Sequence, residues 1–173
     1  MVNVINVKAG NLFEFITELK LDGILSAANG TGPMGRGIAG AIKRYGGEEI
    51  QRDAYMVCRE QNPQEGDAYS TISGHLVNQG IKKIIHAVTM KKPAGKTSIE
   101  ICEKAFRSAL ELAEKEGIKK LACTALGTGV GGLDPKEIAK KMLPIAQASK
   151  VNVFFVDLDQ AFIDEIQRIL KWV

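Results

Sequence analysis

Two glycine-rich segments of the chain have a spacing suited to binding phosphate. Gly35–Gly40 and Gly127–Gly132 each match G-x-G-x-x-G, and each lies between an apolar, strand-like segment and a helix-like segment. Glycine lets backbone N–H groups approach an anion closely, and the start of the following helix contributes about half an elementary positive charge. One such match is weak support for a phosphate site, but two of them indicate a diphosphate held from both sides.

The periodicity of apolar residues predicts strands and helices in alternation. Strands are predicted at 2–7, 23–28, 67–73, 81–88, 120–126 and 151–156. Helices are predicted at 11–19, 38–44, 48–61 and 97–117. A further helix begins at 135 and bends or ends at Pro144, and a terminal helix follows a cap at Asp159 and extends to 170. Thr97 with Glu100 has the capping-box spacing, and Asp134 with Pro135 predicts another helix start.

This alternation is typical of an α/β fold. It predicts a three-layer α/β/α sandwich with a mixed, largely parallel central sheet of about six strands and an antiparallel pairing within residues 67–88. The length of 173 residues suits one domain over residues 1–173. In such sheets ligands bind at the carboxyl ends of strands, where both glycine segments are expected.

Composition and cysteine use predict a cytoplasmic protein. The chain is 45% hydrophobic and 25% charged with a net charge of +3, which is far from the strongly basic balance of nucleic-acid-binding proteins. Cys58, Cys102 and Cys123 are odd in number and are predicted to be reduced core residues. His75 and His86 have no partner at metal-ligand spacing, so no metal site is predicted. No signal peptide and no membrane span of about 18 residues is expected.

Four segments, in order along nearly the whole chain, resemble the macro domain family, which binds ADP-ribose and related nucleotides. Residues 23–29 resemble the family's D-A-I-V-N-A-A-N strand and residues 34–42 its G-G-G-V-x-x-A-I loop. Residues 85–88 resemble its I-H-x-V strand and residues 126–132 its S-T-G-I-[YF]-G loop. The resemblance implies that the partner is ADP-ribose or an ADP-ribosylated molecule, with nucleic acid only as an ADP-ribosylated substrate and with no cofactor.

The resemblance also implies a set of ligand contacts. These are Asn11, Leu12, Asn29, Gly35, Arg36, Gly37, Ile38, Gly127, Thr128, Gly129, Val130, Gly131 and Val156. The two glycine loops would donate backbone N–H groups to the diphosphate. Asn29 would offer an amide donor and a carbonyl acceptor to the distal ribose, and the alternative is a turn asparagine that satisfies local backbone.

Three departures from the family pattern concern the base and the distal ribose. Asn11 stands where the family usually has an aspartate that accepts from adenine, and its alternative role is a helix N-cap. Val156 stands where many members have an aromatic residue that stacks on the base, and its alternative role is strand core. Gly131 replaces an aromatic residue of the second loop, which predicts a less enclosed distal ribose.

A fourth departure concerns catalysis. Ala39 stands where many hydrolytic members have an acidic residue, and alanine can neither accept a proton nor orient water. A lysine-dependent branch of the family has an M-G-x-G-I-A loop like residues 34–39, and there Lys91 or Lys92 would attack the sugar with help from Asp134. The alternative is that the lysines are solvated loop charges and that Asp134 is only an N-cap.

Three functions follow for testing. The leading hypothesis is a module that binds ADP-ribose or a derivative and processes it weakly or not at all. The second is an active ADP-ribosyl or O-acetyl-ADP-ribose hydrolase. The third, a dinucleotide-dependent oxidoreductase, is disfavoured because the chain is helical around Asp53, where an acid at the end of a second strand is required. Ser26 and Ser70 lack the G-x-S-x-G context of a serine hydrolase.

Overall fold

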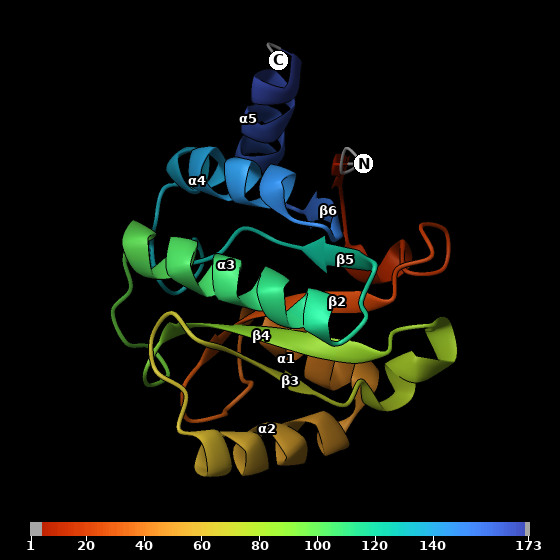
Figure 1. Cartoon of the computed structure of the whole chain (residues 1–173), viewed down its shortest axis with the longest axis vertical. Coiled ribbons are helices and arrows are strands. Elements are labelled where there is room, and N and C mark those ends of the chain that lie inside the picture. Colours follow the sequence, from red (N-terminus) through yellow and green to blue (C-terminus); the bar gives the residue numbers. More distant parts are fainter. Residues whose placement is uncertain (1–4, 172–173) are drawn as a thin grey trace.

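A six-stranded sheet runs through the middle of the molecule, with helices on both faces (Figure 1). The computed structural model describes residues 5–171. The strands are β1 (Ile5–Ala9), β2 (Gly23–Asn29), β3 (Ala68–Thr71), β4 (Lys83–Met90), β5 (Lys120–Cys123) and β6 (Asn152–Asp157). The α-helices are α1 (Gly37–Gly46), α2 (Glu48–Gln61), α3 (Ile99–Lys115), α4 (Pro135–Ala148) and α5 (Gln160–Lys171), and two 3-10 helices are η1 (Leu12–Glu14) and η2 (Gly74–Gln79).

The sheet order is β1-β6-β5-β2-β4-β3. Neighbouring strands are parallel except β3, which pairs antiparallel with β4. The predicted mixed sheet and its single antiparallel pairing are therefore confirmed. Because all the parallel strands end at one edge of the sheet, the loops that follow β1, β2, β4, β5 and β6 meet there.

Alternate residues of each strand face opposite helical layers. Leu25 and Ile85 belong to the cluster that also contains buried residues of α3, α4 and α5. Ile24 and Ile84 belong to the cluster that contains buried residues of α1 and α2. This period of two buries both faces of the central strands, as their nearly continuous apolar sequences require. The three cysteines are free and buried, as predicted.

The segment between β2 and α1 is fixed by a buried side chain of α2. Gln51 is 7% exposed, and its Oε1 accepts from the backbone N–H of Met34 at 2.8 Å while its Nε2 donates to the carbonyl of Gly32 at 2.9 Å. Gly47, with a φ of +100°, turns the chain between α1 and α2 so that α2 packs back beneath this segment. Helix α2 thus fixes the segment that leads to the first glycine loop.

Several predicted element boundaries are wrong for local reasons. The helix predicted at 11–19 is only the short η1, because aromatic and β-branched residues disfavour a longer helix there and the segment continues as turns. The strand predicted at 120–126 ends at Cys123, since the N–H of Ala125 donates to the Asp157 carboxylate at 2.8 Å rather than to a strand. β3 ends at Thr71, because the N–H of Ile72 donates to Asp53.

Two helix ends also differ from the prediction. Ser98, rather than Thr97, is the N-cap of α3, and its Oγ accepts from the N–H of Ile101 at 3.1 Å. Helix α4 continues through Pro144 to Ala148, because this proline lies on an exposed face where the carbonyl that loses its partner can meet water. The part of the first predicted strand at residues 2–4 lies outside the described residues.

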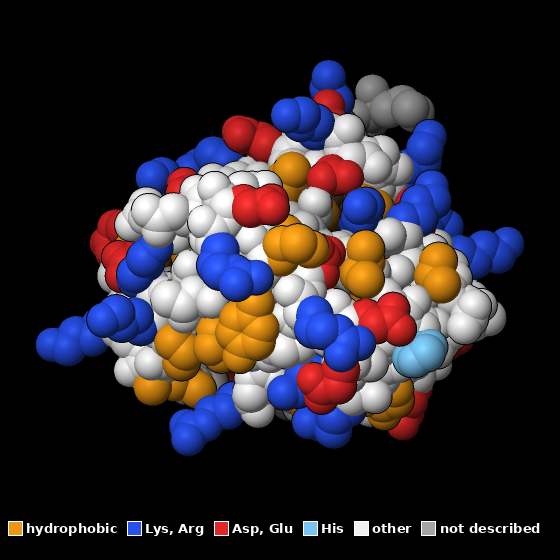
Figure 2. Space-filling view, turned by 90° about the horizontal axis from the view of Figure 1, so that it is seen from below, with side chains coloured by type: hydrophobic (Ala, Val, Ile, Leu, Met, Phe, Trp, Pro, Cys, Tyr) orange, Lys and Arg blue, Asp and Glu red, His pale blue; other side chains and the backbone are white. Residues whose placement is uncertain are grey.

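No helix within residues 5–171 is both long enough and apolar enough to cross a membrane. On the face that carries α2, Lys and Arg side chains are interspersed with Asp and Glu (Figure 2). This mixture differs from the strongly basic face of a nucleic-acid-binding protein.

A buried histidine joins β3 to β4. His86 is fully buried, stacks on Tyr69 at 4.5 Å between ring centroids, and pairs through Nε2 with the Thr71 hydroxyl at 2.8 Å. Its Nδ1 has no hydrogen-bond partner among the described residues. Burial lowers the pKa of His86 to about 3.

The stability of the protein should depend on pH through His86. The folded state keeps the imidazole neutral, whereas the unfolded chain binds a proton near pH 6.5. Stability is therefore full above pH 6.5 and falls as the pH is lowered toward 3, by up to about 1.4 kcal/mol per pH unit. Denaturant unfolding at a series of pH values gives the slope of the unfolding free energy against pH. This slope should be smaller for His86→Gln than for wild type, and the exposed His75→Gln should have the wild-type slope. Equal slopes for wild type and His86→Gln would contradict this assignment.

Replacing Gln51 should loosen the segment before α1. Gln51→Leu leaves the N–H of Met34 and the carbonyl of Gly32 buried without partners, which costs about 1–3 kcal/mol of unfolding free energy. Chemical denaturation measures this loss. Arg52→Leu, at the exposed neighbouring position, is the matched control and should change stability by less than about 0.5 kcal/mol.

Candidate functional site

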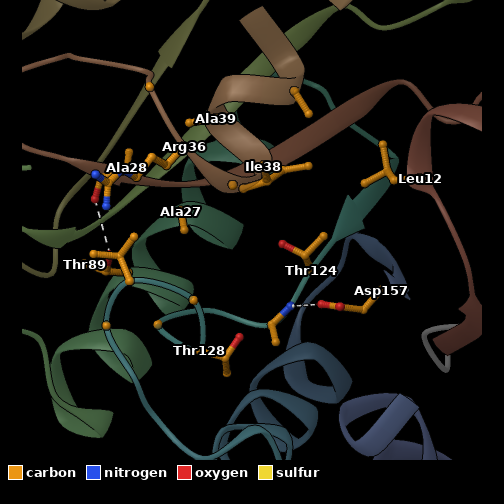
Figure 3. Close-up of a pocket in the computed structure, with 18 of the residues that line it drawn as sticks. Leu12, Ala27, Ala28, Arg36, Ile38, Ala39, Thr89, Thr124, Thr128 and Asp157 are labelled. Carbon is orange, nitrogen blue, oxygen red and sulfur yellow. Dashed lines mark hydrogen bonds between the residues drawn. The ribbon is translucent and has the colours of Figure 1, made fainter. Parts of the chain in front are cut away.

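A cavity of about 720 Å³ lies at the carboxyl ends of the parallel strands. Its size is within the usual range for small-molecule sites. All thirteen of the predicted ligand contacts line it: Asn11, Leu12, Asn29, Gly35, Arg36, Gly37, Ile38, Gly127, Thr128, Gly129, Val130, Gly131 and Val156. Leu12 and Asp157 lie at one end of the cavity, and Thr89, Ala28 and Arg36 lie at the other (Figure 3).

Helix α1 begins in the cavity without a side-chain cap. Its N-cap residue, Arg36, makes no side-chain hydrogen bond to the first turn. By contrast, Ser98 caps α3 and Asp134 caps α4 with oxygen atoms that accept from backbone N–H groups. The first N–H groups of any helix lack intrahelical partners, and at this end of the sheet they adjoin the cavity. The start of α1 therefore offers donors and partial positive charge to an anion.

The second glycine loop lines the cavity between β5 and α4. A β-carbon at Gly127 would lie 2.8 Å from Cys102 Sγ, and one at Gly131 would lie 2.6 Å from the Gly127 carbonyl oxygen. The N–H of Leu133 closes the loop on that same carbonyl at 2.9 Å. At Gly129, in contrast, a β-carbon would meet no atom within 4 Å. The loop is thus packed tightly on its inner side and open at its tip.

Asn29 is largely occupied by its own turn. Its Oδ1 accepts from the N–H and hydroxyl of Thr31 and from the N–H of Gly32, and its Nδ2 donates to the Pro33 carbonyl at 2.9 Å. The amide oxygen therefore has no free lone pair for a ligand, while one Nδ2 hydrogen remains. The alternative role of a turn asparagine is present, and only the donor half of the predicted ribose contact is still available.

The opposite end of the cavity is built from the ends of β1 and β6. Asn11 caps η1, since its Oδ1 accepts from the N–H of Phe13 at 3.0 Å. Val156 is 1% exposed and is strand core as well as cavity wall. Asp157, which the sequence reasoning missed, accepts through its two carboxylate oxygens from the N–H groups of Ala125 and Asp159 at 2.8 Å each. It joins the ends of β5 and β6 and thereby shapes this wall.

Three further lining residues come from η1 and α1. Phe13 and Tyr45 stack face to face, with 4.2 Å between ring centroids and 11° between ring planes. Arg44 lines the cavity beside them. The sequence contains a signal for these residues, because Ile38, Ala41 and Tyr45 follow one another at helical spacing of three and four. Once the start of α1 is placed at the ligand, this spacing brings one face of the helix along the cavity.

The residues predicted for catalysis do not line the cavity. The Lys91 ammonium donates to Asn62 Oδ1 at 2.8 Å and to the Pro63 carbonyl at 3.0 Å. Lys92 is exposed, and Asp134 is an exposed helix cap. Among the described residues, the single acidic residue in the cavity wall is Asp157, whose two carboxylate oxygens each accept from the backbone.

Comparisons with known proteins agree with this architecture. An uncharacterized protein of Aquifex aeolicus is 41% identical over 162 residues, which cover 90% of this chain and 93% of the relative. The O-acetyl-ADP-ribose deacetylase of Salmonella typhimurium is 36% identical over 141 residues, which cover 80% of this chain and 71% of that enzyme.

Among solved structures, a variant of the Oceanobacillus iheyensis macrodomain with ADPR matches with a TM-score of 0.80 and 24% identity, covering 98% of this chain and 93% of that one. The macrodomain of Mycobacterium tuberculosis DarG matches with a TM-score of 0.75 and 22% identity, covering 89% and 97%. These likenesses show the fold. The Macro domain family model matches residues 25–142. The chain therefore belongs to the macro domain family.

Proposed function

We propose that the protein binds ADP-ribose, free or attached to a macromolecule, through two backbone loops that hold its diphosphate. The observation that carries this proposal is the uncapped start of α1, which lines the same cavity as the second glycine loop. Backbone N–H groups on both loops suit a diphosphate, because it presents oxygen atoms on both sides. The family and the size of the cavity support the same ligand.

The two ends of the cavity suit the two nucleoside-like ends of ADP-ribose. Asn11, Leu12 and Val156 supply a largely apolar wall that suits a base, and Asp157 places a carboxylate at the same end. At the other end, the free Nδ2 hydrogen of Asn29 and the hydroxyl of Thr89 lie where the distal ribose is expected.

Hydrolysis of O-acetyl-ADP-ribose is a second candidate function, which the identity to the Salmonella deacetylase supports. The cavity itself supports binding better, because Ala39 carries no functional group and each carboxylate oxygen of Asp157 already accepts from a backbone N–H group. If turnover of acetylated ADP-ribose or of ADP-ribosylated protein is found, replacing Lys91, Lys92 and Asp134 together by alanine decides their role. Unchanged activity in that variant would remove all three from the mechanism.

The protein should bind ligands that contain a diphosphate more tightly than a monophosphate. Calorimetric titration with ADP-ribose, ADP, AMP and NAD should give ADP-ribose at least about tenfold tighter binding than AMP, because a single phosphate engages only one loop. Equal affinities for ADP-ribose and AMP would contradict the two-loop arrangement. Absence of any ADP-ribose binding would refute the proposed function.

An acidic residue at the tip of the second loop should block the site. Gly129→Glu meets no steric obstacle at the β-carbon, and Gly129 is not among the glycines with positive φ, so the fold should persist. The added carboxylate repels the diphosphate, and we expect ADP-ribose affinity to fall by about 100-fold or more. Gln79→Glu, which makes the same charge change at an exposed position of η2, should leave the affinity unchanged.

A further inference from the structure

We propose that Arg44 is a charged ligand of the diphosphate, added to the backbone donors of the first glycine loop. The inference rests on the proposed function, since it assigns a side-chain partner to the same phosphates. It also predicts that the affinity for this ligand falls as the salt concentration rises. A site made only of peptide N–H groups would have a weaker salt dependence.

The geometry of α1 directs Arg44 toward the loop. Arg44 lies one helical turn after Gly40, and side chains of a helix lean toward its N-terminus. A β-carbon added to Gly40 would lie 3.6 Å from Arg44 Nη1 and 3.1 Å from the carbonyl oxygen of Gly35. The Arg44 guanidinium and the carbonyl of Gly35 in the first glycine loop thus lie near each other, on either side of the position that a β-carbon at Gly40 would fill. Arg44 also lines the cavity.

Charge in the cavity favours an anionic ligand at this place. Arg36 and Arg44 are the two cationic side chains of its wall, and neither forms an ion pair with any of residues 5–171. Asp157 lies at the end of β6, where its carboxylate accepts from two backbone N–H groups. The positive charge of Arg44 is therefore not neutralised within the described protein, and a phosphate can take both of its forked N–H donors.

Arg44 differs from the cation next to it in sequence. Lys43 is on the same helix and carries the same charge, but it does not line the cavity. The Arg44 side chain is exposed and forms no ion pair within the described part of the chain, so its replacement should leave the melting temperature unchanged. Lys43→Gln is therefore a matched control for Arg44→Gln in both charge and helical context.

The experiment is a calorimetric titration of wild type, Arg44→Gln, Arg44→Lys and Lys43→Gln with adenosine, ADP, ADP-ribose and inorganic pyrophosphate at three salt concentrations. We expect Arg44→Gln to weaken the binding of ADP, ADP-ribose and pyrophosphate by about tenfold at low salt. The affinity for adenosine should stay unchanged. The affinity of this variant for the phosphate ligands should also depend less on salt. Arg44→Lys should restore part of the loss, and Lys43→Gln should match wild type.

Two results would overturn the assignment. The first is that Arg44→Gln binds ADP-ribose with an affinity within twofold of the affinity of Lys43→Gln. The second is an equal loss for adenosine and ADP-ribose, which would mean that Arg44 acts on the base end through Tyr45 and not on phosphate. If wild type binds pyrophosphate and ADP in an Arg44-dependent way but not ADP-ribose, the proposed function fails and the assignment of Arg44 stands.

Discussion

The site depends on backbone N–H groups that the fold leaves without partners at the start of α1. Ser98 and Asp134 cap α3 and α4, whereas α1 and α2 begin without a side-chain cap, and of these two uncapped helices α1 is the one whose first turn lines the cavity. Unpartnered N–H groups are tolerated where water or a ligand can reach them. The cavity supplies that access, and the rest of the structure keeps the uncapped turn in place opposite the second loop.

That placement is secured by three polar side chains, of which Gln51 lies outside the cavity and Asn29 and Asp157 belong to its wall. Gln51 holds the backbone of residues 32–34 from α2, and Asn29 holds the same segment from the end of β2. On the other side, Asp157 ties the end of β5 to the end of β6. Each is a buried or half-buried polar side chain whose partners are backbone groups, which gives the loops a defined shape.

The sequence was sufficient for the mixed sheet, for the succession of strands and helices along the chain and for thirteen residues of the cavity wall, but not for Asp157. Alternation of strands and helices, together with the positions of the two glycine segments, brings residues from five different loops to one edge of the sheet. These predictions rest on periodicity and topology, which are repeated over many residues and tolerate local errors.

Local hydrogen bonding could not be predicted in the same way. The length of β5 depends on whether Ala125 donates to a strand or to Asp157, which lies 32 residues further along the chain. The cap of α3 depends on a choice between two adjacent hydroxyl residues, Thr97 and Ser98. The resemblance to a lysine-dependent branch predicts Lys91 or Lys92 as the nucleophile, but the Lys91 ammonium donates to Asn62 and Pro63 and neither lysine lines the cavity. Each outcome is decided by a choice of partner that periodicity does not encode.

In the proposed mode of binding, peptide amides form much of the wall that faces the phosphates, and every amino acid except proline supplies such an amide. Substitution can therefore proceed at the positions between the glycines without removing the donors themselves, provided that the turn survives. If the proposal holds, substitutions can change which side chains flank the anion, while the backbone conformation of the two loops preserves the groups that hold it.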